Sequence, residues 1–403
     1  MNVDTARRID RFIGMPLCAI ASGLLRVGWK TRNVPQLIRR VLFIELSEMG
    51  SAILAEPAMR KIRERTNAEL FFVIFQRNAA SLELTGTITE QNVFKIRDES
   101  FLTLFWDTIK FLVWTRKHKI DTVVDIELFS RYTALLTGLS GCSRRAGFYR
   151  FHNEGHYRGE MLTHRVAYNP HIHIAKNFIA QINALLSVAP TTPYSKTIIQ
   201  DAELEFALVS PAAHAIDAIA RKISEVAPTF ELARKRLVLI NPGGNQFIPQ
   251  RRWMPERFVE LIGRVIGAHE DVLVLITGAA NELEFCAAIA ANINHPRCIT
   301  FAGQSTIAEL PALYALSSLI VTSDSGPAHF AAACRLPTVV LFGPETPKLY
   351  KPLGNADVIY AELACSPCVS AQNHRRTPCT DNVCMKAITV DEVFGSVARI
   401  LAR

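Results

Sequence analysis

Hydrophobic residues fall in short runs, separated by longer stretches in which they recur with helical spacing. Runs rich in β-branched and aromatic residues at 41–46, 70–75 and 122–126 predict strands, and the stretches at 52–65 and 103–117 predict helices. Such alternation is typical of a parallel sheet with helices on both faces. The pattern therefore predicts a protein of the α/β class.

The same rhythm restarts in the second half of the chain. Turn formers at 187–195, and Pro228 after a helical stretch at 209–222, place a domain boundary between about 205 and 235. Beyond it, strands are predicted at 236–240, 272–277, 299–301, 319–322 and 338–342, and helices at 256–267, 282–292, 307–315 and 328–333. Two such sheets in succession predict two Rossmann-like, doubly wound domains facing a cleft, with ligands at the carboxyl ends of strands.

The predicted division has four parts: a basic and apolar N-terminal segment (1–38), two Rossmann-like domains (39–215 and 230–385) and a C-terminal helix (386–403). Most of the excess charge lies at the start, because residues 1–40 contain eight basic and two acidic residues, which leaves +6 of the formal +8. A nucleic-acid groove needs basic residues spread along the fold, so no nucleic-acid partner is expected.

An uncharged apolar run at 12–25 lies between Arg11 and Arg26. It is shorter than the roughly 18 residues that a membrane-spanning helix needs. With basic residues around it, the run predicts an anchor in the membrane interface. A cleaved signal peptide and a helix packed on the protein itself are the alternatives.

Two loops that follow predicted strands carry candidate phosphate ligands. In the first, Gly243, Gly244 and Asn245 let backbone N–H groups approach a phosphate, and Arg251 and Arg252 can balance its charge. A simple turn is the alternative for this loop.

The second loop, at 322–329, reads TSDSGPAH and leads into a helix of small residues. Backbone amides and the helix dipole favour an anion there. Asp324 and Ser325 have helix caps as their alternative role, and His329 has a structural one.

The order and spacing of five motifs resemble glycosyltransferase family 9, the heptosyltransferase family: NPGG (241–244), RRWMPERF (251–258), VLVLITG (272–278), TSDSGPAHFAAA (322–333) and LFGPETP (341–347). The segments at 41–54, 123–141 and 163–178 agree more loosely. The resemblance implies a GT-B fold and inverting transfer from an ADP-sugar, typically ADP-heptose, to the lipopolysaccharide inner core. The donor would bind the C-terminal domain and the acceptor the N-terminal domain.

The resemblance also assigns roles by position. Arg251 or Arg252 would lie near the diphosphate and Glu282 near the nucleoside, and the donor loop would use Asp324, Ser325, Gly326, Pro327 and His329. No cofactor is expected. The implied location is cytoplasmic, peripheral on the inner membrane, and the nine cysteines, mostly in apolar segments, suit a reducing compartment.

One position departs from the family. The chain has Gly50-Ser51 where the family has a Gly-Asp pair whose Asp is the proposed general base, and a serine hydroxyl is no base at neutral pH without help. Glu48, Asp125 and Glu127 are the candidate bases, although Glu48 is alternatively a solvated charge and the other two orienting groups. Two alternatives to the function follow: a donor-binding but silent, membrane-associated scaffold of glycan assembly, or a transferase that uses another nucleotide sugar.

Four cysteines near the end of the chain have the ligand count of a structural zinc site: Cys365, Cys368, Cys379 and Cys384. Their uneven spacing favours free thiols instead. No Asp-x-Asp metal motif is apparent, so we expect a transferase that works without a metal.

Overall fold

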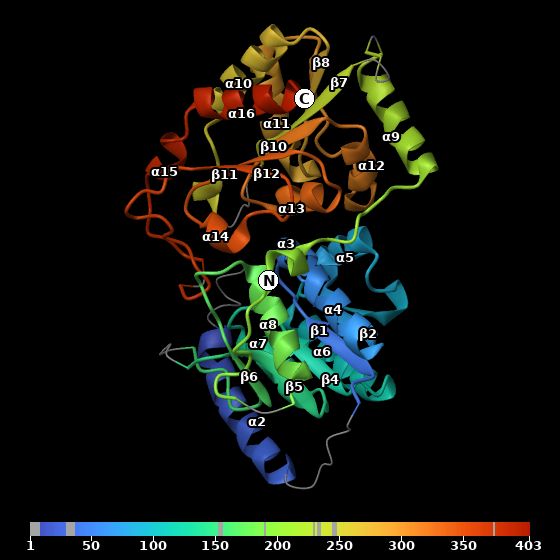
Figure 1. Ribbon diagram of the computed structural model, residues 1–403, viewed down its shortest axis with the longest axis vertical. Helices are drawn as coiled ribbons and strands as arrows, with labels where there is room; N and C mark the ends of the chain where they lie inside the picture. Colours follow the sequence, from blue (N-terminus) through green and yellow to red (C-terminus); the bar gives the residue numbers. More distant parts are fainter. Residues whose placement is uncertain are drawn as a thin grey trace. The chain divides into compact units, whose positions relative to one another are not determined.

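A computed structural model describes residues 9–29, 37–151, 156–188, 191–228, 230–231, 235–243, 248–373 and 375–403. The chain forms two units, Met1–Glu205 and Phe206–Arg403, each with its own sheet (Figure 1). Two candidate phosphate ligands, Gly244 and Asn245, lie outside the described residues.

The sheet of the first unit has six parallel strands in the order β3-β2-β1-β4-β5-β6. The strands are β1 (Arg40–Ile44), β2 (Glu69–Phe75), β3 (Val93–Ile96), β4 (Thr122–Asp125), β5 (Arg144–Tyr149) and β6 (His164–Ala167). The central strands are buried on both faces, which explains why their sequences are almost continuously apolar.

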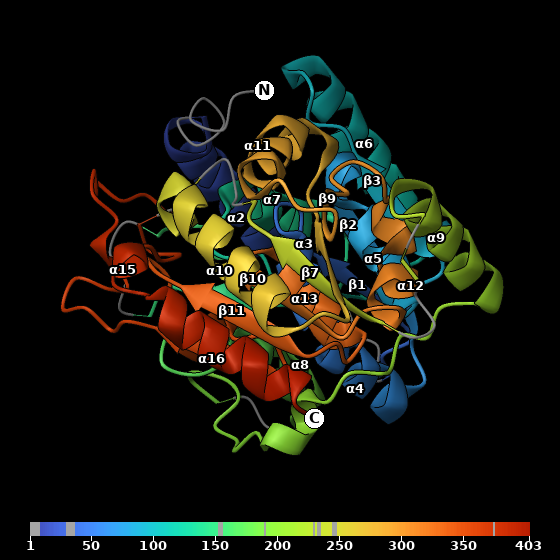
Figure 2. The ribbon, with the colours of Figure 1, turned by 90° about the horizontal axis from the view of Figure 1, so that it is seen from above.

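Helices cover both faces of this sheet. They are α2 (Gly14–Trp29), α3 (Met49–Leu54), α4 (Glu56–Thr66), α5 (Ala80–Thr85), α6 (Phe101–Lys117), α7 (Arg131–Leu139) and α8 (Ile174–Leu186). On one face α8 packs against α3 and α4, and on the other α7 packs between α2 and α6 (Figures 1 and 2). No helix within the described ranges has the length and apolar character needed to cross a bilayer.

The second unit repeats the arrangement with strand order β12-β11-β10-β7-β8-β9, again all parallel. The strands are β7 (Arg236–Asn241), β8 (Val272–Ile276), β9 (Cys298–Thr300), β10 (Leu319–Ser323), β11 (Thr338–Phe342) and β12 (Ala356–Tyr360). The helices are α9 (Ala213–Val226), α10 (Pro255–Ala268), α11 (Leu283–Ile293), α12 (Leu310–Ala315), α13 (Gly326–Ala333), α14 (Pro347–Tyr350), α15 (Val383–Lys386) and α16 (Val390–Leu401). The predicted α/β class with two doubly wound sheets is therefore confirmed.

Both sheets have the strand order typical of Rossmann folds. In this order successive strands are added outward on one side of the first strand, and the fourth strand then pairs with the first on its other side, so the order reverses there. The reversal lies between β1 and β4 in the first unit and between β7 and β10 in the second. Loops that leave the carboxyl ends of these strand pairs diverge to opposite faces and leave a crevice in which ligands bind. Apart from Glu282, which follows β8, the candidate site residues lie in these loops or close to them in sequence.

Candidate functional site

A group of carboxylates lies at the reversal point of the first sheet. Glu45 directly follows β1, and Glu127 follows β4, which pairs with β1 through Ile44 and Asp125. Glu127 Oε2 accepts hydrogen bonds from the N–H groups of Leu46 (2.9 Å) and Ser47 (3.2 Å). Its Oε1 accepts a further bond of 2.6 Å from the Ser47 hydroxyl. Glu127 is therefore held in place by the loop that follows β1.

Glu45 is a site residue that the sequence analysis did not identify. It is 2% exposed, and its Oε1 accepts hydrogen bonds from the N–H groups of Ser47 (3.2 Å) and Glu48 (3.1 Å). Burial, the charges of Glu127 and Glu48, and a hydrogen bond to Glu127 raise the pKa of Glu45 well above its usual range. The Glu45 carboxyl therefore favours its protonated form.

Glu48 lies at the start of α3, as its N-cap residue, but its side chain does not cap the helix. Instead Glu48 Oε2 accepts a 2.8 Å hydrogen bond from the hydroxyl of Ser51, which is buried in the first turn. Glu48 itself is half-buried. Ser51, at the position where the family has an aspartate, thus donates a hydrogen bond to the Glu48 carboxylate. This contact, together with the partial burial of Glu48, distinguishes it from a fully solvated loop charge.

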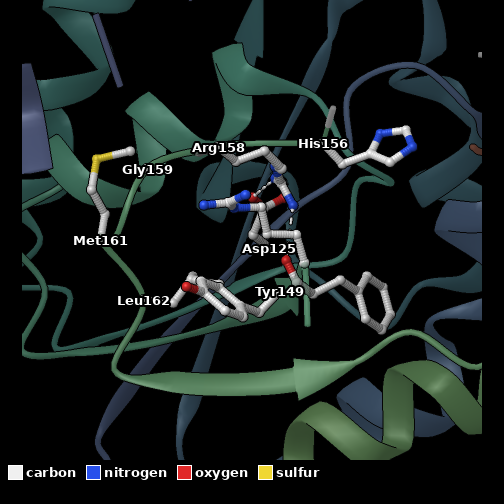
Figure 3. A pocket seen from close by; sticks show the side chains of 10 residues that line it. Asp125, Tyr149, His156, Arg158, Gly159, Met161 and Leu162 are labelled. Carbon is white, nitrogen blue, oxygen red and sulfur yellow. Dashed lines mark hydrogen bonds and ion pairs between the residues drawn. The ribbon is translucent and has the colours of Figure 1, made fainter. Parts of the chain in front are cut away.

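Asp125 has a different environment at the end of β4. Its side chain is buried in an ion pair with Arg158 (Figure 3). Its Oδ2 also accepts a hydrogen bond of 3.2 Å from the Thr133 hydroxyl. Burial raises the pKa of Asp125 to about 6, against the lowering effect of Arg158. The cavity beside the pair has a volume of ≈ 10 Å³, room for about one water molecule. This arrangement favours an orienting role for Asp125.

In the second unit, the loops after β7, β10 and β11 meet at Arg251. The buried guanidinium lies 3.3 Å from Asp324 Oδ2 and 3.6 Å from Glu345 Oε2. Burial raises the pKa of Glu345 to about 7, against the lowering effects of Arg375 and Arg251. Glu345 belongs to the LFGPETP motif but was not singled out from the sequence. The sequence feature that could have identified Glu345 is its position in the loop just after strand β11.

The donor loop leads directly into α13. Ser325 is the N-cap residue of this helix, but its side chain does not cap it and instead donates a 3.1 Å hydrogen bond to the Ser323 carbonyl. Pro327 occupies the first turn, and His329 lies buried in the same turn. The N-terminus of α13 thus keeps the partial positive charge that attracts an anion. The Ser325 side chain does not have the helix-capping role given above as its alternative.

The first glycine of the other loop contacts Glu282. A Cβ atom on Gly243 would lie 2.4 Å from Glu282 Oε1, so only glycine leaves this carboxylate where it is. Glu282 Oε2 accepts a 2.9 Å hydrogen bond from the Ala279 N–H. By contrast, the guanidinium of Arg252 lies over the Phe285 ring, 5.7 Å from its centroid. Of the two candidate arginines, the structure brings Arg251 to the donor loop.

All nine cysteines are free thiols. Of the C-terminal four, Cys365 is exposed and Cys384 is buried, Cys368 accepts a bond from the Thr377 hydroxyl, and Cys379 donates one to the Asp381 carbonyl. Within the described part of the chain, no three His, Cys, Asp or Glu side chains form a group able to hold a metal ion.

Comparison with known proteins gives consistent matches. Residues 117–377 match the family described as glycosyltransferase family 9 (heptosyltransferase). Lipooligosaccharide heptosyltransferase 2 of Campylobacter jejuni is 28% identical over 171 residues, 41% of this chain and 51% of that protein. Lipopolysaccharide heptosyltransferase 2 of Escherichia coli K12 is 33% identical over 129 residues, 31% of this chain and 36% of that protein. These matches thus span about half or less of the relatives' lengths.

Similarity of fold extends over almost the whole chain. The solved structure of E. coli ADP-heptose lipopolysaccharide heptosyltransferase II superposes with a TM-score of 0.68 at 20% sequence identity, covering 90% of this chain and 98% of that one. The predicted GT-B fold is therefore confirmed.

Proposed function

Because the chain belongs to glycosyltransferase family 9, the heptosyltransferase family, we propose that it transfers a sugar from an ADP-sugar to a lipopolysaccharide-core or related surface-glycan acceptor. Heptose is the proposed sugar, and inversion at its anomeric carbon is the proposed stereochemistry. The observation that carries the proposal is the convergence of Arg251, Asp324 and the start of α13 at the reversal point of the second sheet. An anionic donor suits this place because a cationic guanidinium and a helix N-terminus favour negative charge there.

We propose that the second unit binds the donor. Arg251 and the amides at the start of α13 stabilise the diphosphate, first as part of the donor and then as the leaving group. Glu282 binds the nucleoside, and Gly243, which lies against Glu282, leaves its backbone open to the phosphate. Support for an adenine nucleotide comes from the E. coli relative, which is described as an ADP-heptose enzyme.

We propose Glu48 as the general base. Its carboxylate takes the proton from an acceptor hydroxyl while the hydroxyl oxygen forms a bond to the anomeric carbon and the bond to the diphosphate breaks. Glu127 is less available because two backbone N–H groups and the Ser47 hydroxyl already bond to it. Glu45 favours its protonated form, which limits the negative charge around Glu48.

The test is consumption of ADP-heptose by the full chain with delipidated lipopolysaccharide-core acceptors, measured as release of ADP. Turnover with inversion supports the proposal, and a panel of other nucleotide sugars tests the identity of the donor. Binding of ADP-sugars without turnover across a broad acceptor panel would instead establish a silent scaffold, the alternative that Ser51 raises. The proposed location is the cytoplasmic face of the inner membrane, where sugar nucleotides and lipid-linked acceptors meet.

Donor affinity is expected to fall as pH rises through about 7. The raised pKa of Glu345 means that its carboxyl is neutral below about pH 7 and becomes an anion beside Arg251 above it. An ADP-sugar carries a diphosphate diester that keeps its charge over this range, so Glu345 ionisation opposes its binding. We expect roughly a threefold to tenfold loss of affinity between pH 6 and 8, measured by calorimetry without acceptor.

The matched variant for this measurement is Glu345→Gln, which keeps the shape of the side chain and removes the titration. Its affinity should stay constant over the same pH range and equal that of the wild type at pH 6. A wild-type affinity that does not change with pH, or a glutamine variant that retains the change, contradicts this role of Glu345.

A further inference from the structure

The outer face of α6 is apolar. Six large hydrophobic side chains on this helix are exposed, among them Leu102 (70% exposed), Trp106 (58%) and Val113 (62%), with Phe101, Phe105 and Ile109. The inner face instead buries the polar Asp107 and Thr115 beside Phe111. The same inner face also packs Leu104, Leu112 and Trp114 against the core, so the helix is apolar on both sides. A surface helix of a protein surrounded only by water has polar side chains on its outer face, and the outer face of α6 departs from that pattern.

The helix α2 and the residues just before it have a second outward apolar face. Cys18, Ala21 and Ser22 face the protein. The exposed side chains are Phe12, Ile13, Met15, Leu17, Ile20 and Leu24. Of the nineteen large hydrophobic side chains exposed in the described part of the chain, twelve belong to these two faces. Such concentration indicates an interaction surface, since scattered exposed hydrophobic residues are normal but contiguous ones are not.

The two faces are neighbours because both helices pack on α7. Asp10 Oδ1, just before α2, accepts hydrogen bonds from the N–H groups of Arg131 (2.9 Å) and Tyr132 (3.1 Å) at the start of α7. The Tyr132 hydroxyl in turn lies 2.7 Å from the Thr108 hydroxyl in the middle of α6. Figure 2 shows α2 and α6 on either side of α7. We call the twelve side chains together the α2/α6 face.

The charges around the α2/α6 face are mainly basic. The helix α2 contains no acidic residue, and the single acidic residue of α6, Asp107, is buried in an ion pair of 2.8 Å with Arg97. Glu99, just before α6, is also close enough to Arg97 to raise the pKa of its guanidinium. Exposed basic residues flank the apolar side chains: Arg11, Arg26, Lys110, Arg116 and Lys117.

We propose that the α2/α6 face docks on an anionic phospholipid bilayer. The apolar side chains of both helices enter the boundary between headgroups and acyl chains, and the flanking basic residues contact lipid phosphates. The sequence indicated only the first of these helices as an anchor, so α6 is a second and independent contact. The inference goes beyond the proposed transfer reaction and agrees with it, since a lipid-linked acceptor lies in such a bilayer.

A second copy of the chain fits the α2/α6 face less well. In a two-fold symmetric dimer the same surface meets itself, so the basic residues that flank it would face one another. Like charges brought together across an interface oppose association, whereas anionic lipid headgroups are attracted to them. The charge complementarity therefore favours the bilayer.

The experiment is co-sedimentation of the full chain with vesicles of phosphatidylglycerol and phosphatidylethanolamine, compared with vesicles of phosphatidylcholine alone. The test variant combines Trp106→Glu and Val113→Glu, both at exposed positions where a charge does not disturb the core. The matched control combines Leu283→Glu and Val383→Glu, which are 44% and 47% exposed in the second unit. We expect binding of the wild type to anionic vesicles, a loss of roughly tenfold or more in the test variant, and no loss in the control.

Turnover with a delipidated acceptor separates this inference from the proposed function, because the test variant should keep it while losing vesicle binding. The proposal is overturned if the wild type does not bind anionic vesicles, or if the test variant binds them as the wild type does. It is also overturned in favour of a second copy if light scattering shows a wild-type dimer that the same two substitutions convert to a monomer.

Discussion

Replacing Glu48 by glutamine is expected to lower kcat by about 10²-fold to 10⁴-fold and to leave ADP-sugar affinity unchanged. The amide keeps the size of the side chain and an oxygen that accepts the hydrogen bond from Ser51, but it cannot take a proton from the acceptor hydroxyl. Steady-state kinetics with a core acceptor measure kcat, and calorimetry without acceptor measures donor affinity.

Two further variants make this result interpretable. Glu64→Gln changes an exposed carboxylate on α4 in the same unit and should have no effect. Ser51→Ala removes the hydroxyl that holds Glu48 and should lower kcat by much less than the loss of the carboxylate. If Glu48→Gln retains wild-type turnover, Glu48 is not the base, and Glu127→Gln and Asp125→Asn become the variants to measure.

Replacing Arg251 by alanine is expected to weaken ADP-sugar binding by roughly 100-fold or more. The guanidinium lies 3.3 Å from Asp324 and 3.6 Å from Glu345, and without it the donor diphosphate would meet two buried acidic side chains with less positive charge beside them. The same change removes a buried cation that pairs with both acids, so the second unit should lose roughly 3 kcal/mol of stability. Calorimetry and thermal unfolding measure the two effects.

Arg251→Lys separates these effects, because it keeps the charge and should recover most of the stability while binding the diphosphate less well than arginine does. Arg252→Ala addresses the alternative assignment, since Arg252 lies over Phe285 and should have the smaller effect on donor affinity. A larger loss for Arg252→Ala than for Arg251→Ala would show that the other arginine binds the diphosphate.

The hydrophobic pattern was sufficient to predict three strands of the first sheet but not the other three, β3, β5 and β6. Strands β1, β2 and β4 are buried on both faces and read as apolar runs. Strand β5 was missed because it begins with Arg144 and Arg145. The guanidinium of Arg145 is nevertheless buried, where it donates hydrogen bonds to the carbonyls of Met161 (2.5 Å) and Cys142 (2.6 Å). The bond to Met161 spans 16 positions in the sequence, and neither bond leaves a periodic signal.

Helix boundaries show a similar limit. The single helix predicted at 52–65 is two helices, α3 and α4, with Ala55 as the residue between them and Pro57 at the start of the second. Proline is tolerated in the first turn of a helix but not in its interior. Pro57 therefore marks the start of α4, which the hydrophobic periodicity alone did not show. The helix predicted at 209–222 is α9, which begins at Ala213.

The candidate site was predictable where its residues follow strands in glycine-rich or hydroxyl-rich loops. Glu45 was missed because it lies within the apolar run at 41–46 and its carboxyl group lies inside the protein, where only the folded neighbours show that its pKa is raised. Glu345 was missed because its partner Arg251 is distant in sequence. The roles of Glu48, Glu127 and the donor-loop residues stay predictions until the variants are measured.

The packing of α2 on α7 decides how the N-terminal segment should be studied. Asp10 pairs with Arg131, a guanidinium only 3% exposed, and the Ser22 hydroxyl accepts a 2.8 Å hydrogen bond from the Glu160 N–H. A shortened chain without residues 1–29 would therefore remove an ion-pair partner from a buried guanidinium and the acceptor of a backbone N–H. Such a truncation would report loss of folding as if it were loss of lipid binding, which makes point substitutions on the outer face the informative choice.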